Sequence, residues 1–180
     1  MQKWIILLIV LLILIIGIFV VLNVDIETEY IPETEITDTE LRKTMVTLYF
    51  KDKNTENISK ETKLIDSKEL LISPYEKIVQ LLLEGPQNDS YEKTIPEGTV
   101  LNNTRLENGI LILDFSNEFV EMAKDSIQLK NAIHTIVNTV TQLTEINSVK
   151  INVNSEVSNK FLADGIDFSQ VFTNKSFENN

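Results

Sequence analysis

The feature that most limits the fold of this chain is an apolar run near its N-terminus. From Trp4 to Leu22 it reads WIILLIVLLILIIGIFVVL, 19 residues without a charged or polar side chain. A helix of this length, rising about 1.5 Å per residue, nearly crosses the ~30 Å hydrocarbon layer of a membrane. A cleaved signal peptide is the alternative, but its apolar region is usually about 7–15 residues long and ends at small residues, which Leu22-Asn23-Val24-Asp25 does not offer. We therefore expect residues 1–22 to form an uncleaved transmembrane anchor.

The flanking charges predict which way this anchor faces. Lys3 and the α-amino group precede it, and positive charge favours the cytoplasmic side of a membrane. We expect a single-pass protein of the cell membrane, with its N-terminus in the cytoplasm and everything after the anchor outside. Residues 23–44 are expected to form an acidic, flexible tether, because seven acids and a proline are typical of an extended, solvated segment.

Charge and cysteine content narrow the classes of function. The chain has a formal net charge of −11, and residues 42–180 alone hold 20 acids and 15 bases. Proteins bind phosphate backbones through basic faces, so we expect no nucleic acid partner. The chain contains no cysteine. This excludes thiol catalysis, thiolate metal sites and a lipid anchor on an N-terminal cysteine.

A strand is predicted at the start of the soluble part. MVTLYFKD, residues 45–52, is rich in β-branched and aromatic residues and alternates in polarity. The polar stretch KDKNTENISKE that follows offers the first three ligands of a calcium loop. However, Asn57 stands where such a loop needs glycine, and Lys63 stands where it needs a bidentate glutamate. We expect a solvated loop between strands and no metal site.

The first helix of the soluble part is predicted to begin after Ser73. Ser73-Pro74-Tyr75-Glu76 has the form of a capping box, with proline at the first helical position, where no amide is needed. An apolar stripe at helical spacing follows, and Gly85-Pro86 ends it, with left-handed backbone expected at the glycine. A phosphate-binding loop needs its glycines after a strand and before a helix, which is the opposite order. We therefore expect no phosphate site.

A hairpin is predicted around Asn108-Gly109, because both central residues of a type I′ turn need positive φ. A two-residue turn places Leu106 opposite Leu111. Ile110 and Ile112 then point to the other side of the sheet and need cover. We expect the tail, residues 161–172, to fold back onto the sheet and supply part of that cover, and a partner to supply the rest. Ile110 and Ile112 are therefore the predicted interaction face.

A second helix and a last strand complete the domain. Asp125 or Ser126 can cap a helix that runs to about Leu143 with one apolar face, and SVKINV, residues 148–153, is typical of a strand. The order β-α-β-β-α-β predicts an α+β fold, a small two-layer sandwich with two helices packed on a mostly antiparallel sheet. We expect this domain to span residues 45–173 and to end in a disordered tail, residues 174–180.

Few residues are candidates for catalysis. His134 is the single histidine, and its spacing allows neither a serine-histidine-aspartate triad nor a two-histidine metal pair. We expect it at the surface. Asp114 and Glu118 could pair as carboxylates after the central strand. Asp114 or Ser116 could instead cap a short helix, with Glu118 near its positive end. We expect capping, with no catalytic residue and no cofactor.

Several segments, taken in order, resemble the GerMN domain family, named for a spore germination and sporulation protein of Gram-positive bacteria. They are VTLYF, LLLEGP, TIPEGT, NGILILDFS and AIHTIVNTVTQLTEINSVKINV, within about residues 45–155. The matching pattern positions, which the physical interpretation makes turns and caps, are Gly85, Pro86, Pro96, Gly98, Thr99, Asp114 and Ser116. The family commonly has an Asp-Gly turn after its last strand. This chain has Asn152-Val153-Asn154-Ser155-Glu156 there, so we expect a looser turn.

The resemblance implies binding rather than catalysis. The family resembles the ring-building domains of the channel between mother cell and forespore, and no catalytic residues are associated with it. It implies a non-enzymatic extracytoplasmic assembly domain in sporulation or germination, with sporulation proteins as partners and homo-oligomers when tethered. Two alternatives stay open. One is a cell-wall or small-ligand binding protein, and the other is a wall hydrolase using Asp114 and Glu118, which would have to lie about 5–10 Å apart across a cleft.

Overall fold

The computed structural model describes residues 3–4, 12–15 and 42–177, and the chain forms two compact units, residues 1–36 and 37–180. Within the expected anchor, residues 3–4 and 12–15 are helical. The rest of the anchor and most of the expected tether lie outside the described residues. Among the described residues, no helix is both long and apolar enough to cross a membrane. The transmembrane anchor therefore stays a prediction.

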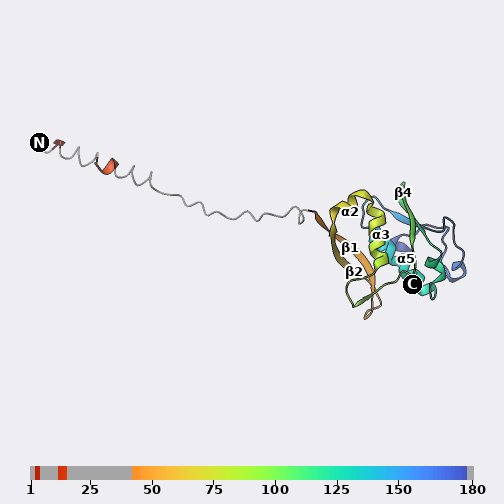
Figure 1. Ribbon diagram of the computed structural model, residues 1–180. Coiled ribbons are helices and arrows are strands. Elements are labelled where there is room, and N and C mark those ends of the chain that lie inside the picture. The colour runs from red at the N-terminus through yellow and green to blue at the C-terminus, as the bar shows by residue number, and fades with distance from the viewer. Residues whose placement is uncertain (1–2, 5–11, 16–41, 178–180) are drawn as a thin grey trace. The chain divides into compact units, whose positions relative to one another are not determined.

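The second unit is an α+β domain, as the sequence predicts (Figure 1). Its strands are β1 (Lys43–Asp52), β2 (Ile58–Asp66), β3 (Tyr91–Glu92), β4 (Leu101–Glu107), β5 (Ile110–Phe115) and β6 (Ser148–Val153). Its α-helices are α2 (Ser67–Ile72), α3 (Pro74–Glu84), α4 (Glu118–Glu121) and α5 (Ser126–Val140). Two 3-10 turns follow β6, η1 (Leu162–Asp164) and η2 (Asn174–Phe177). The second of these occupies part of the stretch for which we expect a disordered tail.

The described strands form two three-stranded sheets, which corrects the single sheet expected from the sequence. The first sheet has the order β2-β1-β3 and is antiparallel, and the second has the order β4-β5-β6. In the second sheet β5 pairs antiparallel with β4 but parallel with β6. The parallel pair needs a long crossover, which α4 and α5 provide. Helix α3 contacts both β1 and β4, so it joins the two sheets around one hydrophobic core.

Strand β2 begins within the stretch expected to be a loop, so the loop between strands is shorter than predicted, and β2 itself is absent from the predicted order β-α-β-β-α-β. β2 pairs with β1 along its length, but its side toward α3 carries charged residues. Lys63 Nζ lies 2.7 Å from Glu84 Oε2 at the end of α3. Glu61 accepts hydrogen bonds of 3.0 Å from the amides of Gln87 and Asn88. These polar pairs replace the apolar alternation that usually marks a strand.

Helix α3 begins at Pro74, as predicted, but the capping box is not formed. Ser73 is the N-cap residue, yet its side chain makes no capping hydrogen bond. Glu76 instead accepts a hydrogen bond of 3.1 Å from Gln80, one turn later. The start of α3 therefore relies on proline at its first position rather than on reciprocal side-chain caps.

Gly85 ends α3 with a backbone conformation that differs in one respect from the prediction. Its φ of +94° is positive, as expected, but its ψ of 178° lies outside the left-handed helical region. Its amide donates to the carbonyl of Leu82 at 3.2 Å. This combination of φ and ψ is essentially restricted to glycine.

The β4–β5 hairpin is confirmed in turn type and register. Asn108 has φ +50° and Gly109 has φ +80°, the signs that a type I′ turn requires. Leu106 lies opposite Leu111, as the two-residue turn predicts. A Cβ atom on Gly109 would meet the end of the Asn147 side chain, which would have to move to make room.

Helix α5 carries the predicted apolar face. The Asp125 carboxylate caps the helix by accepting from the amide of Gln128 at 2.7 Å. The helix ends at Val140, short of the expected end near Leu143. Its buried apolar residues are Leu129, Ala132, Ile133, Ile136, Val137 and Val140. They belong to the same core as the buried residues of both sheets.

The C-terminal tail folds back onto the second sheet, as predicted. Phe172 forms an antiparallel bridge with Val149 of β6, with N–O distances of 2.9 and 2.7 Å. Lys150 Nζ donates to the carbonyl of Phe168 at 2.7 Å. The fully buried ring of Phe168 packs edge-on against Phe119 and Phe172. These contacts place the aromatic rings of the tail in the core.

Candidate functional site

The predicted interaction face lies on one side of the second sheet. In register across β4, β5 and β6, its rows are Arg105, Ile112 and Lys150, and Asn103, Asp114 and Asn152. We call this surface the outer face: Asn103, Arg105, Ile110, Ile112, Asp114, Lys150 and Asn152. A shallow hollow of about 210 Å³ lies on it, beside Ile112.

Ile110 and Ile112 are partly buried, whereas Leu111 and Leu113, which alternate with them, are fully buried. The alternation predicted for β5 is therefore correct. The tail reaches the border of this face through its backbone, since Lys150 Nζ donates to the carbonyls of Phe168 at 2.7 Å and Ser169 at 2.5 Å. Its aromatic rings lie in the core instead, where Phe168 packs against Phe119 and Phe172. The outer face thus keeps a small apolar centre within a polar and charged border.

Asp114 lies at the edge of the outer face and is 9% exposed. Its carboxylate accepts hydrogen bonds from the amide of Ser155 at 2.6 Å and from the hydroxyl of Ser155 at 3.2 Å. It caps no helix, because Asn117 is the N-cap residue of α4, so the capping role expected for Asp114 is wrong. Asp114 instead holds the turn that follows β6.

That turn is tight rather than loose, which corrects the expectation from the sequence. Asn154 and Ser155 have φ of +49° and +68°. The amide of Val153 donates to the carbonyl of Glu156 at 2.8 Å, and the reverse bond measures 3.1 Å. Two non-glycine residues with positive φ are strained. The hydrogen bonds that Ser155 donates to the Asp114 carboxylate offset that strain, at a turn where the GerMN pattern commonly has glycine.

The other candidate catalytic groups do not join Asp114 in these contacts. Glu118 forms a hydrogen bond with the Ser116 hydroxyl, which is the main reason that the pKa of Glu118 lies below its ordinary value. His134 lies on α5 and is partly buried rather than fully at the surface, and its burial lowers its pKa. Among the described residues, no three His, Asp or Glu side chains are placed to hold a metal ion.

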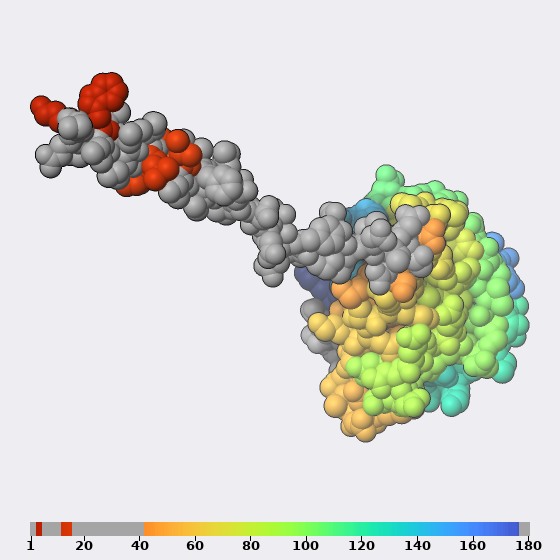
Figure 2. Space-filling model, turned by 60° about the vertical axis from the view of Figure 1, so that its left-hand side comes forward, coloured from red at the N-terminus to blue at the C-terminus, as the bar shows by residue number. Residues whose placement is uncertain are grey.

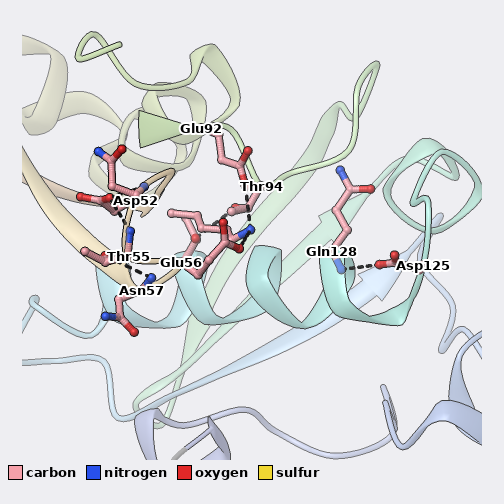
Figure 3. Close-up of polar contacts among 11 residues, drawn as sticks. Asp52, Thr55, Glu56, Asn57, Glu92, Thr94, Asp125 and Gln128 are labelled. Carbon is pink, nitrogen blue, oxygen red and sulfur yellow. Dashed lines mark hydrogen bonds and ion pairs between the residues drawn. The ribbon is translucent and has the colours of Figure 1, made fainter. Parts of the chain in front are cut away.

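A second surface feature, which the sequence does not predict, is a polar cleft between the end of β1, β3 and the start of α5 (Figure 3). The lining residues are Lys51, Glu92, Lys93, Thr94, Lys124, Asp125, Ile127, Gln128 and Asn131. Lys51 Nζ contacts the carboxylate of Glu56 and lies 2.9 Å from that of Glu92. Thr94 hydrogen-bonds to the buried Thr135 of α5 at 3.0 Å.

Most of the charge in this cleft is paired within the protein. Hydrogen bonds to Glu56 and then to Glu92 raise the pKa of Lys51. Asp52 Oδ1 accepts from the amides of Asn54 and Thr55, which lowers the pKa of Asp52 and closes the β1–β2 turn. The residues that line the cleft therefore come from β1, β3, α5 and the segments next to them. Its sequence signal is absent because Lys51 meets Glu92 only through the register of β1 and β3.

A family model described as Germane, sporulation and spore germination, matches residues 47–158, more than half of the chain. The chain belongs to the Germane family. This match extends from β1 to just beyond the turn after β6 and confirms the resemblance drawn from the sequence segments. It assigns the chain a role related to sporulation or spore germination. No curated protein matches the chain.

Solved structures support the Germane fold. A "Putative Lipoprotein from Clostridium perfringens" is 25% identical with a TM-score of 0.52, over 78% of this chain and 94% of that one. The tandem GerMN domains of the sporulation protein GerM from Bacillus subtilis are 20% identical with a TM-score of 0.59, over 78% of this chain and 49% of that one. The first GerMN domain of the same protein is 24% identical with a TM-score of 0.53, over 63% of this chain and 84% of that one.

The structure brings together some of the Germane pattern residues. Gly98 has φ +76°, and the Thr99 hydroxyl donates to the carbonyl of Pro96 at 2.7 Å, so the predicted turn is confirmed. Ser116 Oγ accepts from the amide of Val100 at 3.0 Å, and the Ser116 amide donates to the carbonyl of Val100 at 2.9 Å. The two segments TIPEGT and DFS thus form one junction beside β4 and β5, and their roles in it are structural.

Proposed function

We propose that this Germane protein is a non-enzymatic interaction protein, held at the cell membrane by its N-terminal segment, with its domain outside the cytoplasm. The family match supports a role in sporulation or germination. The observation that carries the interaction part is the outer face, where Ile110 and Ile112 keep accessible apolar surface between charged neighbours. An apolar centre with a polar border is the usual anatomy of a protein interface.

Assembly into a ring-like complex between mother cell and forespore is the specific form that we propose. The partners would be other extracytoplasmic sporulation proteins or further copies of this chain. Tethering raises the local concentration of such domains, so contacts that are weak one at a time can still produce assembly. A monomeric isolated domain at micromolar concentration is compatible with this proposal.

A small-ligand or cell-wall binding role is the second candidate, and the polar cleft is its best site. The cleft encloses about 210 Å³, whereas pockets for drug-sized ligands usually measure about 300–1,000 Å³. Lys51, which lines the cleft, is already paired with the carboxylates of Glu56 and Glu92. Both properties favour protein binding over this alternative.

A carboxylate-based hydrolase has less support. Such an enzyme needs one carboxyl group to donate a proton and a second to act across a cleft. Asp114 binds Ser155 in the turn after β6, while Glu118 is partly buried and its pKa is lowered, which disfavours proton donation.

The interaction proposal is tested by co-purification from sporulating cells with the Ile112→Glu variant of the full chain. A glutamate at this position lies in register between Arg105 and Lys150, so folding should be kept. Partners found with the parent should be lost, while the thermal midpoint stays within a few degrees. Met122→Glu, a change at a 56% exposed residue after α4, is the matched control and should retain them. Unchanged co-purification with Ile112→Glu would contradict the proposal.

A further inference from the structure

The start of the domain carries apolar side chains that the described part of the fold does not cover. Met45 on β1 and Leu64 on β2 lie directly opposite each other and are 74% and 58% exposed. Leu71 and Ile72, at the end of α2, are 82% and 84% exposed. We call these four residues the basal patch. Their neighbours Val46 and Ile65 are buried, so the strands are well packed at this point.

These four side chains lie near the place where the N-terminal part of the chain enters the domain. Lys43 at the start of β1 pairs with Asp66 at the end of β2. The amide of Ser67 donates to the carbonyl of Arg42, which joins the start of α2 to the same place. Figure 1 shows α2 beside the beginning of β1, and Figure 2 shows orange and yellow surface from this part of the chain along one side of the domain.

Charge distinguishes this part of the domain from the rest. Residues 42–72 contain seven bases and five acids, whereas residues 73–180 contain eight bases and 15 acids. Arg42 pairs with Asp66, and Glu69 pairs with Lys77 of α3. Among the described residues, Lys43 and Lys68 form no ion pair. Lysines without an ion partner in the described part of the chain therefore flank the exposed apolar side chains.

We propose that the basal patch lies against the anionic lipid surface of the membrane, an inference that rests on the proposed N-terminal anchor. Apolar side chains with lysines around them are the composition of interfacial membrane contacts. The 19 residues between Leu22 and Arg42 can extend to roughly 70 Å at most, so the domain cannot leave the neighbourhood of the membrane. The more acidic remainder, residues 73–180, is repelled by anionic lipid and would face away. The outer face then stays available for partners.

The test uses a single cysteine, because the chain has none. Ile72→Cys in the full chain is labelled with the polarity-sensitive dye NBD and reconstituted into vesicles of phosphatidylglycerol and phosphatidylcholine. The emission should shift to shorter wavelength, and lipids with a spin label near the headgroup should quench it. Ile127→Cys, on α5 and also strongly exposed, is the matched control and should keep the emission of a label in water.

Flotation of the same vesicles separates the possible failures. Protein that does not float with vesicles would refute the anchor, and with it this inference. Protein that floats but gives water-like emission from residue 72 would overturn the membrane contact alone. A blue shift that persists in detergent micelles, and that grows with protein concentration, would assign the basal patch to a second copy and overturn the lipid proposal. Loss of the shift in vesicles of phosphatidylcholine alone is the result expected for an electrostatic contribution.

Discussion

Several turns of this domain depend on single residues with a backbone conformation that few side chains tolerate. Gly85 has a φ and ψ that are essentially restricted to glycine, and Ser155 has positive φ without being glycine. The backbone conformation at Gly85 requires glycine, whereas the conformation at Ser155 is held by the carboxylate of Asp114 on β5. The two positions therefore predict opposite responses to substitution.

Gly85→Ala should destabilise the domain by about 1–3 kcal/mol, the usual cost of a strained backbone. The reason is conformational, since the added Cβ would meet Lys93 at an ordinary 3.6 Å. Urea denaturation measures the loss. Gly165→Asn is the control: Gly165 has φ +82° and ψ 19°, where asparagine is tolerated, and no atom lies within 4 Å of the added Cβ. Equal losses in the two variants would contradict this account.

Asp114→Ala should cost about 2 kcal/mol, because the amide and hydroxyl of Ser155 lose their acceptor. Ser155→Gly relieves the strain of φ +68°, and this gain should exceed the loss of the long 3.2 Å hydroxyl hydrogen bond to Asp114, so the variant should be more stable than the parent. It should also reduce the cost of Asp114→Ala, and a double-mutant cycle by urea denaturation measures this coupling. Additive effects of the two changes would show that Asp114 does not support the turn.

The domain should lose stability as pH falls from about 7 toward 5, in part through His134. Burial lowers the pKa of His134 below its ordinary 6.5, so the unfolded chain binds a proton more readily than the folded one. The resulting loss begins as pH falls through 6.5 and is complete below the folded pKa. Urea denaturation at several pH values should show a smaller decline for His134→Gln than for the parent. Identical declines would mean that other groups cause the effect.

At the scale of elements, apolar patterns predicted the helices α3 and α5, the strands β1, β5 and β6, and the β4–β5 hairpin. They failed for β2, because its side toward α3 carries Glu61 and Lys63, which are satisfied by groups at the end of α3. They also failed to predict two separate sheets. Which strands pair depends on contacts between distant segments, such as the parallel pairing of β5 with β6, and nothing local in the sequence specifies those contacts. Of the candidate site, Ile110 and Ile112 could be predicted from alternation. The polar cleft could not, because it depends on register between distant segments.

The tail after β6 is a structural element of the domain, and Phe168 is its anchor. Its ring is fully buried and packs against Phe119 and Phe172, at centroid distances of 6.4 and 5.9 Å. Phe168→Ala should therefore destabilise the domain by about 3–5 kcal/mol. Val171→Ala, at a residue 42% exposed, should change stability by only about 0.5 kcal/mol. The free energy of unfolding from urea titration distinguishes them, and a small loss for Phe168→Ala would mean that the tail is peripheral.

At the scale of the whole molecule, the domain offers different surfaces for different contacts. The basal patch lies near the entry of the chain, and the outer face lies on the second sheet. The chain covers about half of the tandem GerMN structure of GerM, which holds two such domains. In the proposed assembly, the neighbours of this domain would be other extracytoplasmic sporulation proteins or further copies of this chain. Under this proposal, the outer face is the part on which function should depend.

The most direct test is the yield of heat-resistant, germinating spores from a sporulating strain that carries only a variant copy of this gene. Ile112→Glu should lower the yield to that of the deletion strain while the protein remains folded and present at normal levels. Glu118→Gln should restore the yield of the parent, because the proposed function assigns no reaction to its carboxylate. The reverse outcome, with full yield from Ile112→Glu and loss with Glu118→Gln, would contradict the account and indicate carboxylate chemistry.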